Sequence, residues 1–184
     1  MVFPIVGGTQ STGYEISNSL LFNGANQYLE RTPSSAGNRR TFTTSWWSKL
    51  KVNEASRWVF GAGTQANDND YFLWQSGHLL KFSFATEASG NIQTTQVFRD
   101  PAAWYHCIMA VDTTQSTASN RVKFYLNGSQ ITSFAGAETY PDQNYDTNIN
   151  NTVVNRIGAR AYSATGHYSG LIAEMHHIDG SQLD

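Results

Sequence analysis

The strongest constraint on the fold is a strand and hairpin unit in the second half of the chain. Tyr105–Val111 (YHCIMAV) is apolar at both odd and even positions, which is typical of a central strand buried on two faces. After a polar loop, Val122–Leu126 (VKFYL) alternates with a period of two, so one face is buried and the other is wetter. Asn127-Gly128 follows and indicates a type I′ turn, because both central residues of that turn need a positive φ. The unit predicts an antiparallel sheet.

The rest of the chain repeats this pattern of short strand segments separated by turn residues, with no convincing helix. The segments are NSLLFNG, NQYLERT, TFTTSWWSKL, SRWVFGAG, DYFLWQSG, HLLKFSFAT, NIQTTQVF, RIGARA and YSGLIAEMHHID. This succession predicts an all-β chain, folded as an antiparallel sandwich or barrel. Residues 136–155 form a long polar loop, and loops of that length are uncommon unless they are functional or pack against the domain.

The start of the chain differs from the rest in composition. The first sixteen residues are rich in Gly, Ser and Thr and have no periodicity. We therefore expect an extended N-terminal arm over residues 1–16, followed by one β domain over residues 17–184. The apolar stretch at the start is broken by Pro4, Gly7 and Gly8 and has no basic segment before it, so we expect no signal peptide.

Charge and cysteine content argue against several classes of function. The net charge is -2 with 12 Lys and Arg, which does not suit a nucleic-acid-binding surface. No apolar run approaches the roughly 20 residues of a membrane-spanning helix, so we expect no membrane insertion. Cys107 is the single cysteine, and its place in the central strand predicts a small buried side chain rather than a nucleophile.

The motifs WYH, AVD and NRVKFYLNGSQI, followed by IGA and YSGLIAEMHHIDGSQL, resemble laminin-G-like and pentraxin-like domains of the concanavalin A-like lectin/glucanase superfamily. The resemblance covers the chain from about Ile5 onward. It implies a concanavalin A-like antiparallel jelly-roll β-sandwich of two curved sheets, in which a concave face or a loop rim can hold carbohydrate. Relatives usually continue beyond the position of Asp184, which leaves open whether the protein is longer.

Two segments, GGTQSTGYEISNSLLFNGANQYLERTPSSAGNRRTFT and TTQVFRDPAAWYH, also resemble domains in structural proteins of tailed bacteriophages. That resemblance implies a non-enzymatic virion protein, made in the host cytoplasm. The leading hypothesis is a tail fibre or tail appendage module that contacts sister chains, for example in a homotrimer, and other virion proteins. It would bind a host-surface glycan or receptor. The alternatives are a capsid decoration protein that stabilises the shell and a glycosidase that degrades polysaccharide.

Carboxylates give little support to catalysis or to metal binding. Glucanases of the superfamily carry Glu-x-Asp-x-(x)-Glu on one strand, and no such string occurs here. Asp68 and Asp70 are the nearest pair, but turn formation explains them more simply, so no catalytic residue is predicted. Calcium needs six to eight oxygen ligands, for which Asp68, Asp70, Asp142 and Asp146 are weak candidates. No spacing matches a calcium loop, and no cofactor is expected.

Aromatic residues are better candidates for ligand contact. Trp46 and Trp47 are adjacent on a predicted strand, so their side chains point to opposite faces and only one can lie between two sheets. We expect one of them on an outer or concave face, covered by a loop, a partner or a ligand, and Trp47 is the candidate. Trp58, Tyr71 and Trp74 are further candidates for a platform on which a sugar ring stacks.

The closing segment, IAEMHHIDG, contains a dense group of titratable residues. Strict alternation would place Ile172, Glu174, His176 and Ile178 on one face and Ala173, Met175, His177 and Asp179 on the other. His176 and His177 would then point apart and could not bind one metal ion together. Glu174 and His176 could pair on one face, and a metal site would need a third ligand such as His106. No metal site is predicted.

Overall fold

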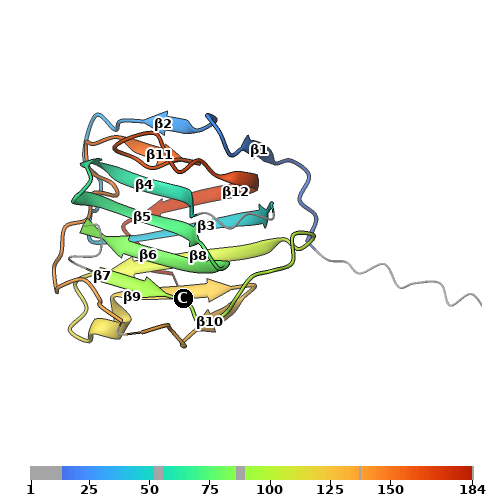
Figure 1. The fold of residues 1–184 in the computed structure, drawn as a ribbon. Coiled ribbons are helices and arrows are strands. Elements are labelled where there is room, and N and C mark those ends of the chain that lie inside the picture. Colours follow the sequence, from blue (N-terminus) through green and yellow to red (C-terminus); the bar gives the residue numbers. More distant parts are fainter. Residues whose placement is uncertain (1–13, 52–55, 86–89, 137, 184) are drawn as a thin grey trace, which may run out of the picture.

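The computed structural model describes residues 14–51, 56–85, 90–136 and 138–183. They form two six-stranded antiparallel sheets that pack face to face as a concanavalin A-like jelly-roll sandwich (Figure 1). The predicted all-β fold class is therefore confirmed. Within these residues, no helix has the length and apolar character needed to cross a membrane.

The two layers, called sheet A and sheet B, contain strands from both halves of the chain. From edge to edge, the strands of sheet A are β1 (Leu20–Asn23), β12 (Ser169–Asp179), β3 (Thr41–Leu50), β8 (Tyr105–Asp112), β9 (Val122–Leu126) and β10 (Ser129–Ile131). Those of sheet B are β2 (Leu29–Arg31), β11 (Asn155–Ile157), β4 (Arg57–Gln65), β5 (Asp68–Gln75), β6 (Leu79–Phe84) and β7 (Gly90–Gln93). Each strand overlaps a segment expected from the sequence, and several extend one or two residues beyond it, namely β4, β5, β7, β8 and β11.

The hairpin between β9 and β10 has the predicted turn. Asn127 has a φ of 47° and Gly128 a φ of 81°, the two positive values that a type I′ turn requires. Ser129 then pairs with Leu126, so the strands continue directly from the turn.

One apolar core joins the two sheets. Trp46 of β3 has no exposed surface and stacks on Phe72 of β5, with ring centroids 4.8 Å apart. The buried Ser48 hydroxyl accepts hydrogen bonds from the indole N–H groups of Trp46 (2.9 Å) and Trp74 (3.4 Å). A buried indole N–H needs an acceptor, so one hydroxyl allows two tryptophans to lie in the core.

The strand β8 is central, as expected, but it is not buried on both faces. Cys107 and Met109 face the core with no exposed surface, whereas His106 and Ile108 are only half-buried on the outer face of sheet A. The prediction of burial on both faces was therefore wrong at Ile108. This side chain lines a hollow on the outer face of sheet A. The prediction that Cys107 is a small buried side chain is confirmed, and burial raises the pKa of its thiol.

The long loop of residues 136–155 packs against the sandwich. Thr147 donates its backbone N–H to the Arg39 carbonyl (3.1 Å), and Tyr145 accepts a hydrogen bond at its carbonyl from the Thr113 hydroxyl (2.8 Å). Arg40 forms an ion pair with Asp146 at 2.7 Å. The loop is therefore held by the domain at several points.

The predicted N-terminal arm lies mostly outside the described residues. Residues 1–13 are not described, while Tyr14, Glu15 and Ile16 precede β1 without forming a strand. The division at residue 16 therefore stays a prediction.

Candidate functional site

Trp74, one of the predicted ligand contacts, lies in the core between the sheets. Only 2% of it is exposed, and its ring packs edge-on against Phe98 at 5.0 Å. A side chain in this position cannot meet a ligand at the surface. The expectation that Trp74 contacts a ligand was therefore wrong. Consecutive residues of β5 are buried on both faces of the strand, so the sequence pattern does not indicate which face points to the core.

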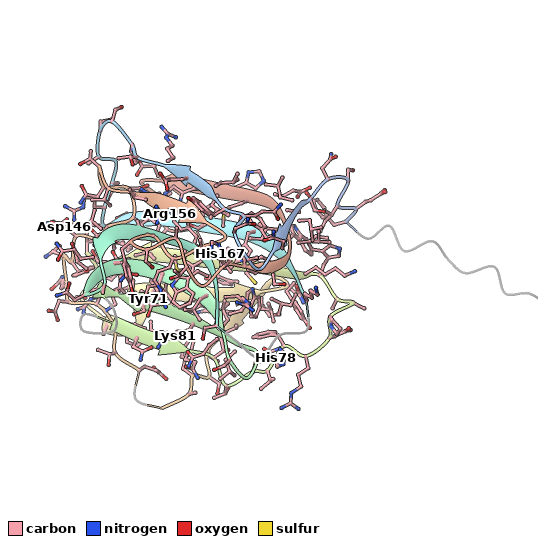
Figure 2. The ribbon with its side chains drawn as sticks, turned by 45° about the horizontal axis from the view of Figure 1, so that its top comes forward. Tyr71, His78, Lys81, Asp146, Arg156 and His167 are labelled. Carbon is pink, nitrogen blue, oxygen red and sulfur yellow. The ribbon has the colours of Figure 1, made fainter. Side chains whose placement is uncertain are left out.

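Trp58 and Tyr71 lie on the outer face of sheet B, but a loop covers them. Together with Leu73 they form a small apolar cluster apart from the main core, 8% and 6% exposed respectively. The Arg160 guanidinium lies over the Trp58 ring at 4.1 Å, and the Gly166 carbonyl accepts a hydrogen bond from the Trp58 backbone N–H. Figure 2 labels Tyr71 on this face of the sheet. In this structure neither ring offers a free face to a sugar.

Trp47 is the tryptophan that lies on the outer face of sheet A, as expected from its neighbour in the core. It pairs with His106 of β8 on one side and Ala173 of β12 on the other. The His106 ring stacks on the indole at 4.8 Å. Tyr14 stacks on it as well, with ring centroids 5.4 Å apart and planes at 3°. We expected a loop, a partner or a ligand to cover this tryptophan, and Tyr14 of the same chain covers it.

A hollow of about 290 Å³ adjoins this aromatic group on the same face of the sheet. It is lined by Thr43, Ser45, His106, Ile108, Tyr125, Gly128, Ile178 and Leu183. In the part of the chain that the structure describes, the Ser45 hydroxyl, the His106 ring nitrogens and the Tyr125 hydroxyl form no hydrogen bond. The surface therefore combines an apolar floor with polar groups that are free to bind a ligand. Desolvation lowers the pKa of His106 and outweighs the opposite effect of the Glu174 charge. The lowered pKa favours a neutral ring, which can both donate and accept a hydrogen bond.

Sequence reasoning missed part of this surface. His106 was considered only as a metal ligand, and Tyr14, Ser45 and Tyr125 were not candidates. The alternation of β8 does contain a signal, because it separates His106 and Ile108 from the core-facing residues. Tyr14 gives no such signal, since it belongs to a segment without periodicity.

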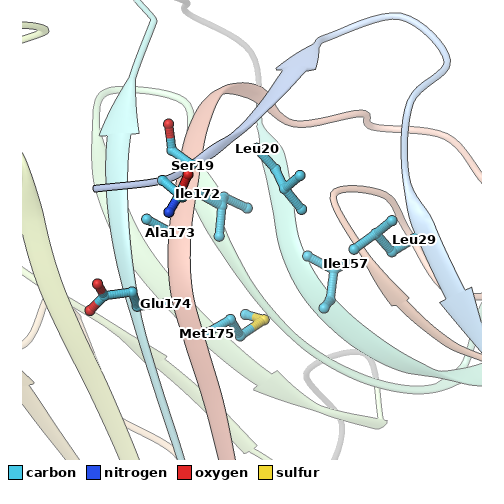
Figure 3. Close-up of a pocket in the computed structure, with 9 residues that line it drawn as sticks. Ser19, Leu20, Leu29, Ile157, Ile172, Ala173, Glu174 and Met175 are labelled. Carbon is cyan, nitrogen blue, oxygen red and sulfur yellow. The ribbon is translucent and has the colours of Figure 1, made fainter. Parts of the chain in front are cut away.

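Glu174 reaches this surface because β12 contains a bulge. Ala173 pairs with Trp47 and His176 with Ser45, so two residues of β12 lie opposite Trp46 alone. Glu174 has a φ of 46°, and in Figure 3 its side chain points to the opposite side of the strand from Ile172 and Met175, although all three residues line the same hollow. Its carboxylate accepts a hydrogen bond from the Tyr14 hydroxyl.

The bulge corrects the predicted faces of the closing strand. Ile172 pairs with the buried Ser48 and lies on the core side, whereas His176 and Ile178 pair with Ser45 and Thr43 on the outer side. Ala173 likewise moves to the outer side, opposite Trp47. The expectation that Ile172 shares a face with Glu174 was wrong, because one extra residue reverses the alternation.

The histidines of β12 do point apart, as expected. His177 is bonded at both nitrogens, to the Thr44 hydroxyl (2.9 Å) and the Asn150 side-chain oxygen (2.7 Å). Among the described residues no ion pair joins Glu174 and His176, since Glu174 bonds to Tyr14 instead. No group of three His, Cys, Asp or Glu side chains in those residues could hold a metal ion.

The aspartates proposed as calcium ligands serve different contacts. Asp70 has no exposed surface and accepts hydrogen bonds from the backbone N–H groups of Ala85 (2.8 Å) and Asn148. Asp68 accepts a bond from the Asn148 side chain (2.7 Å). Asp146 pairs with Arg40, and Asp142 lies exposed in the same loop. Calcium binding stays a prediction.

Asp70 also bears on the glycosidase hypothesis. Burial raises the pKa of Asp70 to about 6, against the effect of its hydrogen bonds, and the nearby Asp68 charge adds to the rise. A raised pKa next to a second carboxylate is typical of a glycosidase acid. However, Asp70 has no surface at which it could meet a substrate, so the pair anchors the long loop to sheet B.

Comparisons with known proteins agree with this architecture. A family model described as the concanavalin A-like lectin/glucanases superfamily matches residues 23–181. No curated protein sequence matches the chain.

Several solved structures share the fold at low sequence identity. The CBM40 of the Ruminococcus gnavus IT-sialidase, bound to α2,3-sialyllactose, is 10% identical with a TM-score of 0.65, over 90% of this chain and 91% of that one. Domains LG4-5 of the mouse laminin α1 chain are 11% identical with a TM-score of 0.57, over 88% of this chain and 41% of theirs. A heptameric SAP-like pentraxin from Limulus polyphemus is 14% identical with a TM-score of 0.55, over 85% and 73%. At such identities these likenesses establish the fold.

Proposed function

Because the chain belongs to the concanavalin A-like lectin/glucanase superfamily, we propose that it is a non-catalytic glycan-binding module that uses the outer face of sheet A. One observation carries the proposal: the Trp47 indole lies on the outer face of sheet A, outside the core, beside polar side chains that form no hydrogen bond within the described residues. The likeness to the sialyllactose-bound CBM40 supports a glycan as the ligand class.

The chemistry of this surface suits a sugar ring. A pyranose has an apolar face that packs on an aromatic ring, and its hydroxyl groups need donors and acceptors around that ring. Trp47 supplies the aromatic surface, and a neutral His106 both donates and accepts. Ser45 and Tyr125 add hydroxyl groups along the next row of the sheet, since Ser45 pairs with Ile108 and Ile108 with Tyr125. Such groups fix the orientation of a ligand more than its affinity.

On the outer face of sheet A, the described residues supply no carboxyl pair at catalytic spacing, which supports a binding role over a glycosidase role. A retaining glycosidase needs two carboxyl groups about 5 Å apart that both reach the substrate. On the proposed face, the described strands carry Glu174 beside Trp47 and Asp112 beside Thr41. Thr41 and Trp47 are six residues apart on β3, which separates the two carboxylates by about 20 Å, too far for a glycosidase pair. The Asp68 and Asp70 pair is closed to a substrate by the burial of Asp70.

For the biological setting, we propose a tail fibre or tail appendage module of a tailed bacteriophage, with the glycan on the host surface and sister chains as partners. The resemblance of residues 7–43 and 94–106 to segments of phage structural proteins supports this setting. Capsid decoration is the competing location. Cryo-EM of intact particles distinguishes them, because an appendage protein occurs in few copies at the tail and a decoration protein follows the capsid lattice. The native mass of the purified protein tests the homotrimer.

Binding to a neutral oligosaccharide panel (lactose, maltose, cellobiose, chitobiose and mannobiose) and to sialyllactose tests the binding function. We expect at least one sugar to bind, and Trp47→Ala to weaken its binding at least tenfold while the protein stays folded. Tyr28→Ala is the matched control, because Tyr28 is a partly exposed aromatic residue that lies next to Arg156 of sheet B. Equal affinity of wild type and Trp47→Ala would contradict the proposed face, and no binding to any sugar would contradict the proposed function.

A further inference from the structure

Tyr14 lies where a sugar would stack on Trp47. Its ring is parallel to the indole, at 3°, and its hydroxyl donates a hydrogen bond to the Glu174 carboxylate. It reaches Trp47 of β3 and Glu174 of β12, while the chain that follows enters β1 at the edge of the same sheet. The segment Tyr14–Ser19 therefore crosses the outer face of β12 as a strap.

The strap is held lightly. Tyr14 is 67% exposed, and every residue from Tyr14 to Ser19 except Ile16 is exposed as well. One face of the tyrosine ring packs on Trp47, and the remainder meets solvent. Tyr14 covers one face of Trp47 but stays mostly exposed itself, so little of its own surface is buried in this contact.

We propose that Tyr14 occupies a sugar subsite on Trp47 and Glu174, and that a neutral hexopyranose displaces it on binding. This inference rests on the proposed function and adds the subsite, its ligand class and its regulation. The N-terminal strap then acts as a competitor supplied by the chain itself, and the affinity for glycan depends on the fraction of molecules in which Tyr14 has left.

The two contacts of Tyr14 define the ligand class. A replacement must present an apolar ring face to the indole and a hydroxyl donor to the carboxylate, which a neutral pyranose does. An ionised carboxylate accepts hydrogen bonds but does not donate them, so an acidic sugar at this position would place two acceptors of like charge together. Lys49 lies on the outer face of β3, two residues from Trp47, and pairs with Leu171, three residues before Glu174. Lys123 pairs at Ala110, on the far side of β3 from Glu174.

The cost of displacing Tyr14 sets the expected effect. Aromatic pairs of this kind shift an equilibrium by about two- to tenfold beyond their burial. We therefore expect Tyr14→Ala to bind the preferred neutral sugar about two- to tenfold more tightly than the wild type. Tyr14→Phe keeps the ring and loses the hydroxyl, so it should lie between the two.

A first experiment measures the cover directly and needs no ligand. Acrylamide quenches exposed tryptophans, so Tyr14→Ala should increase quenching relative to the wild type. Trp47→Phe provides the reference, because in that background the Tyr14→Ala change should have no effect on quenching. Equal quenching of wild type and Tyr14→Ala would contradict the inference that Tyr14 covers Trp47.

A second experiment titrates lactose and α2,3-sialyllactose, a matched neutral and acidic pair, together with the neutral disaccharides named above, into wild type, Tyr14→Ala and Tyr14→Phe. Tighter binding of a neutral sugar to Tyr14→Ala supports the inference. Unchanged or weaker binding to Tyr14→Ala, with wild-type binding intact, overturns the inference and leaves the glycan-binding function standing. Tighter binding of sialyllactose than of every neutral sugar overturns the ligand class. No binding by any variant contradicts the function itself, whatever the quenching result.

Discussion

At the scale of single residues, two adjacent histidines have different surroundings. His176 points to the outer face, while His177 binds Thr44 and Asn150 and lies near the rings of Phe42 and Phe60. Desolvation lowers the pKa of His177 below its ordinary value of 6.5, and the charge of Asp179 opposes this only in part. Asn150 in turn donates to Asp179 and to the Asn38 carbonyl, so the ring joins β12 to two loops.

We expect His177 to make the protein less stable as the pH falls below about 6.5. The unfolded chain, with the higher pKa, binds a proton first, so the stability present above 6.5 is lost as the pH falls through the folded pKa. Urea unfolding between pH 7.5 and 5 should show a weaker pH dependence for His177→Gln than for the wild type. His176→Gln is the control and should follow the wild type; if both variants behave alike, His177 is not the source.

At the scale of elements, the loop from β11 to β12 is fitted closely to sheet B. Gly166 has a φ of 63°, and a methyl group built on it would overlap the Trp58 ring. The loop therefore depends on a residue without a side chain, which explains why Trp58 is covered instead of exposed. The sequence could not show this, because Gly166 and Trp58 are far apart in the chain.

Gly166→Ala should lower the free energy of unfolding by about 2–5 kcal/mol, combining backbone strain at positive φ with a steric clash. Gly77→Ala is the matched control, since Gly77 has a φ of 84° and no atom within 4 Å of the added methyl group. It should lose only the backbone part, about 1–2 kcal/mol. Chemical denaturation measures both, and equal losses would mean that the contact with Trp58 is not tight.

Local pattern predicted the strands well and their faces less well. The alternation of VKFYL and the Asn127-Gly128 pair depend on neighbours in sequence, and both were confirmed. Trp74 and Trp58 could not be placed, because their exposure depends on the opposite sheet and on a loop from the other end of the chain. The position of Tyr14 could not be predicted for the same reason, since its contact with Glu174 joins residues 160 positions apart.

At the scale of the whole molecule, both sheets depend on one core. The stack of Trp46 on Phe72 crosses from sheet A to sheet B, and Ser48 bonds indoles from both sheets. Among the residues that the structure describes, the second apolar cluster contains only Trp58, Tyr71 and Leu73, so neither sheet has another large core on which it could stay folded. We therefore expect the domain to unfold in one cooperative transition.

Substitution of the adjacent tryptophans tests this arrangement. Trp46→Ala should cost about 3–5 kcal/mol of unfolding free energy, because it leaves a cavity between the sheets. Trp47→Ala should cost about 1 kcal/mol, because it removes only surface stacking. Urea unfolding followed by far-UV circular dichroism and by fluorescence gives both values. A similar loss for the two, or transitions that do not coincide, would contradict a single core between the sheets.

The bulge in β12 has a consequence for comparing this chain with its relatives. The extra residue at Glu174 or Met175 decides which of the following side chains face the aromatic surface and which face the core. An alignment that omits a gap at this point will match outward residues with inward ones from His176 to Asp179. Insertion or deletion of one residue, rather than substitution, is therefore the change by which a lineage could exchange the two faces of this strand in a single step.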